Sequence, residues 1–559
     1  MNNIADRDVP PDANNYALTM QAPDPVDLAE ALDSPEANEW MVAELKEQNS
    51  FLERDVLEIV PRSQAKGKRI FKYKRVLKTK RFPPTIEEPL GPIDKRKIRV
   101  TIQAFTKMLK LGIDYAEKYA STVRFETILV LIAIATITNL DIMLTDIATF
   151  FLYGDLPDEV YMEQVDEWAS EDKPKEDFVC KLKKSMYGLP QASLCAQKKL
   201  KKTLLKDGVF KQSTADDCVY VGQGAESDFV ALGAHVDDLI SVGNENGFKK
   251  LIATLRSEFK ITIKKNPDVI MGMQIERDRK RGWTKVHQEG YIMNLLKNFG
   301  MEDCRSTATP MDPGAAKSLM MLPIGPELTN AKVLKDYQSL VGAMLWLKSR
   351  PDMLFTINLL SRFLKNATPA HLAMARDRPL RYLQGTKNWG ICFQAGEEGP
   401  ALSGESDADF AGDLDTSRTT LGVYEKIGEF GTIMCRSSLE RKICTSTGQG
   451  ETYAMQSLTK NVVWTRHLME DLGYAPKLPT PVFTDNDGVI KQSTKAINHT
   501  KAKHYRTAQA YIREKQASGV INVGSVHTSK NAADMLTKAL PKEAFVRHRR
   551  TIMGPQQPE

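Results

Sequence analysis

Apolar and polar positions alternate along the chain in a pattern that changes twice. From about residue 98 to 300, short β-branched runs such as "FVALGAHV" (229–236) alternate with helical spacing, which predicts an α+β fold. Between about 300 and 395 the helical period dominates, most clearly in "YQSLVGAMLWLKSRPDMLFTINLLSRFL" (337–364). A second α/β pattern runs from about 400 to 550. The chain therefore contains several successive structural regions.

The first residues lack this pattern. Residues 1–32 are largely polar and contain several prolines, which predicts a disordered leader. A helix is expected next, with Ser34 as its N-cap and Pro35 in its first turn. The apolar residues at helical spacing that support this helix are Ala37, Trp40, Met41 and Leu45.

Composition excludes several classes of protein. The chain is 42% hydrophobic and 26% charged, as expected for globular domains, and its longest apolar run (127–137) is too short to span a bilayer. The sequence starts without the basic and apolar pattern of a secretory signal. Seven cysteines without CxxC spacing argue against a zinc site or a disulfide framework, so a reducing intracellular compartment is expected.

Positive charge is concentrated near the start of the first α+β region. Residues 62–81 hold ten Lys or Arg and no acid, interleaved with aromatic residues, within a chain whose net charge is +6. Such a segment fits a phosphate-binding surface. A solvated basic face or a strand edge protected by lysines fits the same residues equally well.

A pair of adjacent acids interrupts an apolar run in "AHVDDLISVG" (234–243). Asp237 and Asp238 could form a simple hairpin turn, because Asp is a common turn residue. Asp146 ends another strand-like run, 91 residues earlier. If the two strands are neighbours, the three carboxylates converge at one end of a sheet, where two divalent cations could neutralise them and support phosphoryl transfer.

Four further acids occur in the last region. Asp407 and Asp485 lie on strand-like segments, whereas Glu451 and Asp534 lie on predicted helices. Ala533, Leu536 and Leu540 share one helical face, which puts Asp534 in a first turn. Each acid alone is more often a cap or turn residue. Their joint placement predicts a two-metal nuclease site.

A colinear series of motifs identifies a family. The series includes "VCKLKKSMYGLPQA" (179–192), "HVDDLI" (235–240), "SDADFAGD", "FTDNDG" and "ADMLTKALP". Across roughly residues 33–550 the chain resembles the reverse transcriptase and ribonuclease H part of a copia-type retrotransposon polyprotein. The resemblance implies a right-hand polymerase of fingers, palm and thumb, followed by a connection region and an α/β ribonuclease H-like domain.

The resemblance also implies boundaries and roles. It places fingers and palm at 33–300, a helical thumb and connection at 301–397, the ribonuclease H-like domain at 398–550 and a tail at 551–559. Two Mg²⁺ ions are expected in each active site. Their expected ligands, which are also the catalytic residues, are Asp146, Asp237 and Asp238 in the polymerase and Asp407, Glu451, Asp485 and Asp534 in the nuclease.

Three further residues are expected to bind substrates. Arg99 matches an arginine placed toward the incoming phosphates, Phe151 is the expected aromatic residue after Asp146, and Gln191 belongs to a template-facing turn. The expected partners are an RNA template, a DNA primer, an RNA:DNA hybrid and deoxynucleoside triphosphates, with no membrane. The expected location is a virus-like particle in the cytoplasm, or the nucleus.

The sequence departs from the family pattern at several positions. His235 replaces a tyrosine, and Phe150 would obstruct the nucleotide pocket if its side chain pointed there. Pro379 lies within a family helix, at a cost of about 3 kcal/mol if that helix continues. Two other readings therefore remain open: an inactive remnant that binds nucleic acid, and an enzyme with nuclease activity alone.

Overall fold

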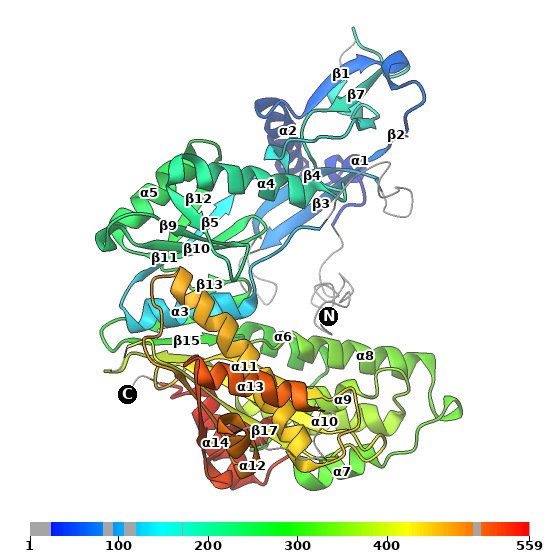
Figure 1. Cartoon of the computed structure of the whole chain (residues 1–559). Helices are drawn as coiled ribbons and strands as arrows, with labels where there is room; N and C mark the ends of the chain where they lie inside the picture. Colours follow the sequence, from blue (N-terminus) through cyan, green and yellow to red (C-terminus); the bar gives the residue numbers. More distant parts are fainter. Residues whose placement is uncertain are drawn as a thin grey trace.

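The computed structural model describes residues 24–81, 93–104, 119–169, 172–397, 399–495 and 505–557. Within these ranges the strands pair into five sheets, and helices cover them, so the predicted α+β class is confirmed. Figure 1 shows an elongated molecule, with the N-terminal elements at one end and the last α/β region at the other. No helix in the described ranges combines the length and the apolar composition needed to cross a membrane.

The fingers are built around a small sheet and a separate strand pair. Their elements are α1 (Leu28–Leu32), α2 (Ala37–Glu53), β1 (Leu57–Pro61), β2 (Ile70–Phe71), β3 (Tyr73–Arg81), β4 (Ile93–Ile102), β6 (Tyr161–Met162) and β7 (Phe178–Leu182). Strands β1, β7, β6 and β2 form the sheet in that order, and β3 pairs with β4. Trp40 of α2 packs on Leu77 and Ile98 of the strand pair, which fixes α2 against one of its faces.

The start of the fingers differs from the prediction. Helix α1 lies inside the predicted leader (1–32) because Leu28 is buried beneath α2, so this part of the prediction is wrong; residues 1–23 lie outside the described residues. Ser34 does not cap α2: its hydroxyl donates to the carbonyl of Ala31 at 2.7 Å and so closes α1. Of the apolar residues at helical spacing, Trp40 is buried, whereas Met41 and Leu45 are 42% and 49% exposed.

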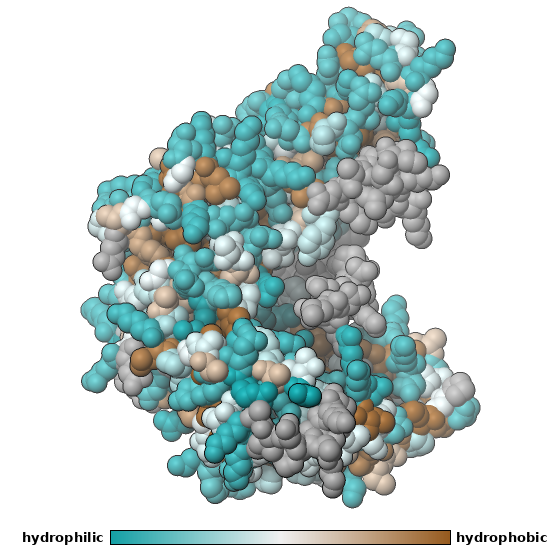
Figure 2. Space-filling model, in the orientation of Figure 1, coloured by the Kyte–Doolittle hydropathy of each residue, from teal (hydrophilic) through white to brown (hydrophobic). Residues whose placement is uncertain are grey.

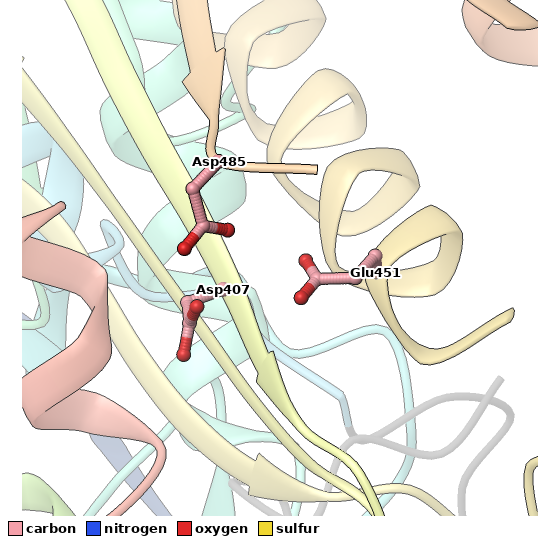
Figure 3. Close-up of side chains that lie close together, drawn as sticks. All are labelled: Asp407, Glu451 and Asp485. Carbon is pink, nitrogen blue, oxygen red and sulfur yellow. The ribbon is translucent and has the colours of Figure 1, made fainter. Parts of the chain in front are cut away.

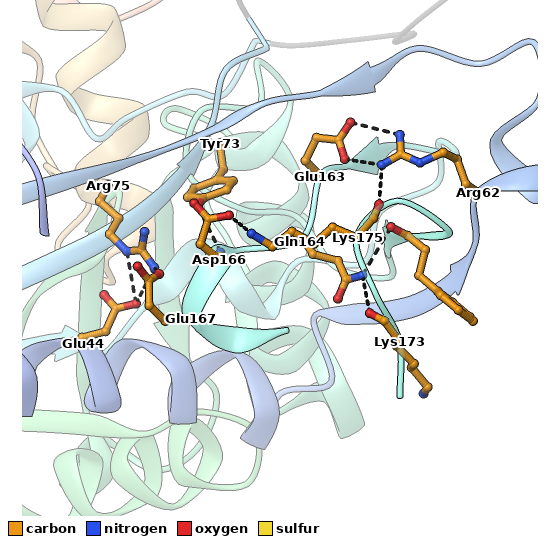
Figure 4. A network of polar contacts seen from close by, with 11 residues as sticks. Glu44, Arg62, Tyr73, Arg75, Glu163, Gln164, Asp166, Glu167, Lys173 and Lys175 are labelled. Atoms are coloured by element: carbon orange, nitrogen blue, oxygen red, sulfur yellow. Dashed lines mark hydrogen bonds and ion pairs between the residues drawn. The ribbon is translucent and has the colours of Figure 1, made fainter. Parts of the chain in front are cut away.

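Two arginines of the basic segment stabilise the fingers. Figure 4 shows Arg75 beside Glu44 of α2, and its Nε and Nη2 atoms donate to Glu44 Oε1 at 3.2 and 3.0 Å. Arg62 pairs with Glu163 at 2.7 Å. The Arg75 and Glu44 side chains are almost fully buried, so their charges are compensated inside the fold. This part of the segment is structural.

The palm is a six-stranded sheet between two helical layers. Its elements are α3 (Phe125–Ile137), β5 (Asp141–Ile147), α4 (Ala192–Leu205), β8 (Phe210–Gln212), β9 (Val219–Gly222), β10 (Val230–His235), β11 (Asp238–Gly243), α5 (Glu245–Arg256) and β12 (Ile261–Lys265). The strand order is β12-β5-β11-β10-β9-β8. Successive side chains of a strand point to opposite faces, so Ile240 packs with α3 and Leu239 packs with α4 and α5. The strand predicted at 229–236 is confirmed as β10.

A second sheet and a group of helices follow the palm. They comprise β13 (Val269–Ile270), β14 (Met273–Asp278), β15 (Trp283–His287), α6 (Glu289–Asn298), α7 (Pro313–Met320), α8 (Ala331–Leu345), α9 (Leu354–Ser361), α10 (Pro369–Gly385) and β16 (Gly390–Gln394). The helical prediction for 337–364 resolves into α8 and α9, separated by a turn at Pro351. Helix α10 continues through Pro379, so the expected cost of about 3 kcal/mol for a proline inside a helix applies here.

The last region is a five-stranded mixed sheet. It comprises β17 (Leu402–Asp409), β18 (Thr420–Ile427), β19 (Thr432–Leu439), α11 (Thr447–Asp471), β20 (Thr480–Thr484), α12 (Asp487–Thr494), α13 (Arg506–Ala517), β21 (Ile521–Ser525) and α14 (Lys542–Met553). Strands β17 to β19 are antiparallel, whereas β20 and β21 join β17 in parallel. Helix α11 packs across the sheet. Together with the palm, this architecture confirms the predicted polymerase and ribonuclease H-like fold.

The last described residues are held against β16. Helix α14 ends at Met553, inside the predicted tail (551–559), and the Gln556 side chain then pairs with both backbone groups of Gly390, at 2.9 and 3.0 Å. The end of the described chain is thus fixed against β16. Residues 558 and 559 lie outside the described residues.

One apolar core connects the palm to the last region. It is continuous from α3 through the palm strands and β13 to β16, into β17, α11 and β20. Figure 2 shows a hollow on the other side of the molecule, between the lobe that holds the fingers and the lobe that holds α8. The palm and the last region therefore share one core, beside an open groove.

A buried charged network holds the helical group to the last region. The Arg350 guanidinium donates to both carboxylate oxygens of Asp352, at 2.9 and 2.8 Å, and to the carbonyl of Thr386 at 2.9 Å. Tyr382 of α10 donates to Asp352 and accepts from Arg549 of α14. Arg350 and Asp352 have fully buried side chains, so each charge depends on the other.

Removing one partner of this network is expected to be costly. Asp352→Ala leaves the Arg350 charge buried without a counterion, so the free energy of unfolding should fall by about 3–5 kcal/mol. Urea denaturation of the full chain measures the loss, and hydrogen exchange in α10 and α14 locates it. Asp377→Ala, which removes an exposed partner of Arg381, is the control and should cost less than about 1 kcal/mol. Equal effects of the two substitutions would contradict the role of burial.

Candidate active sites

The palm acids meet at the end of two neighbouring strands. Strands β5 and β11 are antiparallel, and their register places Asp146 directly opposite Asp238. The predicted adjacency of these strands is therefore confirmed. Asp237 lies in the turn that joins β10 to β11, and Val236 enables this tight turn with a φ of +57°. The turn reading of the Asp pair and the convergence with Asp146 are both correct.

Burial and mutual repulsion act on these carboxylates. Burial raises the pKa of Asp146, and the neighbouring charge of Asp237 raises it further. Burial, then Asp237 and Asp146, raise the pKa of Asp238 to about 6. Ionised carboxylates so placed need cations. Among the described residues, however, the palm acids do not bring ligand atoms within 4.8 Å of one another as a group of three.

Lysines of the fingers face the palm acids. Cross-strand pairing of β3 and β4 places Lys78 opposite Lys97 and Lys80 opposite Lys95, on the face away from α2. Lys97, Lys80 and Lys95 all lower the pKa of Asp146. Burial, then the charges of Arg99 and Lys80, lower the pKa of Lys97 itself to about 8. Lys78 and Lys95 also pair with Asp24 and Asp94, at 3.3 and 3.4 Å, and the positive charge of this face suits an anion.

Arg99 stands at the same face of the strand pair. Its guanidinium lies 5.0 Å from the centre of the Tyr187 ring, which in turn contacts Phe151 edge to face at 5.4 Å. Phe150 points elsewhere: its side chain is buried in the palm core, with 2% exposure. The condition for obstruction by Phe150 is therefore not met. Thr149, directly before it, is left-handed with a φ of +54°, and in the 3₁₀ turn that follows it is Phe151 that lies beside Tyr187.

Gln191 is held by a local partner. It precedes α4 and is buried, and its Nε2 atom donates to Asp158 Oδ2 at 3.2 Å. Gln191 and Asp158 border a cavity of about 420 Å³ that three lysines of α4 also line. The turn before Gln191 is tied to β4, because the amide of Ile102 donates to the carbonyl of Tyr187 at 2.9 Å.

His235 lies beside the palm acids without a metal-binding geometry. It pairs across the hairpin with Asp238 and is half-buried. Burial lowers its pKa, although the charge of Asp237 opposes the shift, so the neutral imidazole is favoured. It therefore adds no positive charge to the palm site at neutral pH.

Three acids of the last region form a compact cluster. The carboxylates of Asp407, Glu451 and Asp485 offer ligand atoms that all lie within 4.8 Å of one another. Figure 3 shows the three side chains pointing toward a common centre, from β17, from the first turns of α11 and from the end of β20. Glu405 of β17 lies beside Phe483 of β20, and two residues further along each parallel strand bring Asp407 and Asp485 together.

The cluster is short of positive charge. Burial, then the charges of Asp407 and Asp485, raise the pKa of Glu451 to about 9. Burial, then Asp534, raise the pKa of Asp407 to about 7. Oxygen Oε2 of Glu451 is buried and has no hydrogen-bond partner. Three hard oxygen donors around one point suit a magnesium ion, and the residues present therefore fit the expected metal.

Asp534 stands apart from this cluster. It is not one of the three grouped acids, and its Oδ1 atom pairs with the Lys538 ammonium at 2.6 Å. The predicted helix through Leu540 is wrong: the segment is a five-residue 3₁₀ helix, Ala532–Leu536, which ends before Leu540. Its charge nevertheless acts on Asp407. The structure thus gathers three of the four predicted nuclease acids and places the fourth beside a lysine.

Sequence reasoning missed the residues that hold Asp407. Thr537 Oγ1 donates to Asp407 Oδ2 at 2.7 Å, and Asn531 Nδ2 donates to Asp407 Oδ1 at 3.4 Å. Both lie within four residues of Asp534, as does Lys538, so the polar character of "NAADMLTK" was the available signal. Gln449, two residues before Glu451, forms a local hydrogen bond: its Oε1 atom accepts from the amide of Thr445 at 2.8 Å.

Comparison with known proteins defines the class. Residues 89–313 match the family model described as reverse transcriptase (RNA-dependent DNA polymerase). The chain is 31% identical over 536 residues to the "Retrovirus-related Pol polyprotein from transposon TNT 1-94" of Nicotiana tabacum, covering 95% of this chain and 39% of the relative. It is 30% identical over 457 residues to the Pol polyprotein from transposon RE1 of Arabidopsis thaliana, covering 81% and 30%.

The similarity extends to a solved structure at a lower level. A foamy viral protease-reverse transcriptase in complex with double-stranded DNA aligns at a TM-score of 0.41 and 10% identity, over 81% of this chain and 67% of that chain. The chain spans less than two fifths of the length of the two curated Pol relatives. Over most of its own length the chain is similar to these retrotransposon Pol polyproteins, and residues 89–313 match the reverse transcriptase family.

The acidic cluster makes stability depend on pH and on metal. The pKa of Glu451 is higher in the folded chain than in an unfolded one, so without metal the folded state loses stability as pH rises from about 5 to about 9. Glu451→Gln should therefore increase the free energy of unfolding of the metal-free chain at about pH 8 by at least about 1 kcal/mol, which also raises its unfolding temperature. At about pH 4 the variant and the parent should agree.

Magnesium should reverse this order. Added Mg²⁺ is expected to stabilise the parent chain at about pH 8 and to leave Glu451→Gln nearly unchanged, because one ligand charge is lost. Thermal unfolding with Mg²⁺ or a chelator gives both results. Stabilisation of the variant to the same extent as the parent would exclude Glu451 as a ligand.

Proposed function

We propose that the chain is an RNA-directed DNA polymerase with a C-terminal ribonuclease H. The observation that carries this proposal is the presence, in one chain similar to retrotransposon Pol polyproteins, of an acid pair on a palm hairpin and a separate acidic cluster on an α/β sheet. The proposed boundaries are 33–300 for fingers and palm, 301–397 for thumb and connection, and 398–550 for the nuclease.

The palm residues suit nucleotide addition. Asp146, Asp237 and Asp238 would hold two Mg²⁺ ions, which when bound stabilise charge on phosphate oxygens and lower the pKa of a hydroxyl group. The lysines of β3 and β4 and Arg99 would neutralise the triphosphate of the incoming deoxynucleotide, and Phe151 would lie beside it. Gln191 would face the template, provided that its bond to Asp158 opens.

The nuclease residues suit hydrolysis of the RNA strand of a hybrid. Asp407, Glu451 and Asp485 would hold the metal, and the hydrogen bonds from Thr537 and Asn531 keep Asp407 oriented. Asp534 would join them by leaving Lys538. The 2′-hydroxyl of RNA would distinguish the strand that is cut.

The proposed partners follow from this chemistry. They are an RNA template, a DNA primer, the RNA:DNA hybrid and deoxynucleoside triphosphates. Binding should fall steeply with salt, because lysines and arginines contact phosphates. The proposed location is a virus-like particle in the cytoplasm, or the nucleus, in keeping with the relatives' description as transposon Pol polyproteins.

Reciprocal variants test the two activities. Asp237→Asn/Asp238→Asn should lower primer extension on an RNA template by at least about a hundredfold and leave cleavage of a preformed RNA:DNA hybrid intact. Asp485→Asn should do the reverse, so each variant is the control for the other. Gel analysis of labelled primer and labelled RNA in Mg²⁺ gives both readouts. Loss of both activities in either variant would contradict two separate sites.

A nuclease-only enzyme is the second candidate. It is favoured by one observation: among the described residues only the nuclease acids bring three ligand atoms within 4.8 Å. In that case the parent chain cuts the hybrid in the same assay, adds no nucleotide, and is unaffected by the palm variant. Salt-sensitive binding without either reaction would instead identify an inactive remnant.

A further inference from the structure

A single helix runs from the nuclease cluster to the palm. Helix α11 carries Glu451 of the nuclease cluster near its start and ends at Asp471. At 1.5 Å per residue, these two residues are about 30 Å apart along the helix axis. Figure 1 shows α11 running from the nuclease sheet toward the palm, beside α3. Its two ends thus belong to different parts of the molecule.

Asp471 fixes the far end of α11 to the palm. Its Oδ2 atom accepts from the Ser213 hydroxyl and the Thr214 amide, both at 2.7 Å, from the Thr214 hydroxyl at 3.1 Å and from the Ala215 amide at 3.3 Å. Burial raises the pKa of Asp471, but these hydrogen bonds outweigh it, so the pKa is lowered. One ionised carboxylate therefore organises a whole turn of the palm.

Ring contacts surround this clamp. Trp464 lies about two helical turns before Asp471. Its indole Nε1 donates to the carbonyl of Ala215 at 2.9 Å. The Arg124 guanidinium lies 4.9 Å from the Trp464 ring, and Arg124 is the residue directly before α3. Phe229 of the palm meets Tyr474, just after α11, edge to face at 5.6 Å.

Paired strands lead from the turn at residues 213–215 to the palm acids. Residues 213–215 lie between β8 and β9, and β9 pairs with β10, with Gly233 opposite Val219. Strand β10 continues into the hairpin that carries Asp237 and Asp238. An unbroken series of paired strands therefore joins Asp471 to the polymerase acids, and α11 joins it to the nuclease acids.

We propose that Asp471 is a positioning residue that sets the distance, along one bound RNA:DNA hybrid, between the primer end and the RNA bond that is cut. The proposal rests on the proposed function, because it needs both reactions. A hybrid held at both sites is cut at the point that the nuclease cluster reaches, and the clamped end of α11 fixes that point relative to the palm.

The clamp acts on spacing and not on the chemistry of either site. Asp471 contacts neither acidic cluster, and the apolar core beneath α11 continues from the palm to the nuclease without it. Loss of the carboxylate should therefore loosen the docking of α11 while both sites keep their internal geometry. The expected result is a wider range of cut positions at an unchanged rate of cutting.

The test stalls synthesis at a defined template position by omitting one nucleotide, and maps the RNA cuts relative to the primer 3′ end. The full-length parent should show one dominant distance. In Asp471→Ala the preference for that distance should fall by about tenfold, the scale of losing a charge-assisted hydrogen bond. Asp471→Asn, which keeps one acceptor oxygen, should fall between them. Cleavage of a preformed blunt hybrid should stay within about twofold in all three.

Two variants guard the interpretation. Glu470→Gln removes the same charge one residue earlier, at an exposed position, and should match the parent. Thr214→Val removes one donor from the palm side and should repeat the Asp471→Ala spread at reduced size, which also serves if Asp471→Ala does not fold.

Each outcome is decisive. An unchanged cut distance in Asp471→Ala and Thr214→Val overturns the proposal. A parallel loss of hybrid cleavage in these variants also overturns it, since Asp471 would then merely support the nuclease fold. A parent chain that extends no primer or cuts no hybrid overturns the proposed function, and the positioning role with it.

Discussion

Repulsion between carboxylates that are withdrawn from water governs this structure. Both candidate sites collect acids whose burial and mutual charge raise pKa values, at Asp238 in the palm and at Glu451 and Asp407 in the nuclease. A fold accepts such groups only where cations are close or can arrive. In the palm, lysines of β3 and β4 lower the pKa of Asp146. In the nuclease cluster, one carboxylate oxygen of Glu451 is buried without a hydrogen-bond partner. The negative charge of the acids also attracts neighbouring cations: Asp146 acts on Lys97, and Lys538 pairs with Asp534.

Much of the fold could be predicted because its strands have clear local patterns. The apolar run before Asp237 is β10, and the acids at strand ends, Asp146 and Asp485, lie where period-two patterns end. The family resemblance added the long-range order that local patterns lack, such as the pairing of β5 with β11 across ninety residues of chain. Local signals were weakest at short helices. Ser34 closes α1 instead of starting α2, since both ends of a helix attract hydroxyl side chains.

The site was predictable in its acids and not in their supports. Thr537 and Asn531 hold Asp407 by hydrogen bonds that depend on a 3₁₀ turn. A turn this short has no apolar periodicity from which it could be predicted. Phe150 and Phe151 are adjacent and chemically alike, so the sequence could not say which ring enters the core and which faces Tyr187. The basic segment likewise divides by strand face: Arg75 pairs with Glu44, while Lys80 faces the acids. Backbone direction decides each case.

The continuous core beneath α3 also bears on how such chains evolve. Residues of α3 such as Ile128 and Ile134 pack in the same cluster as Val423 of β18 and Leu458 of α11. Palm and nuclease therefore share an interior surface, and a nuclease acquired by recombination from a distant element would meet a palm shaped for another partner. Inheritance of the two parts as one unit, with compensating changes on both sides of the junction, is the consequence.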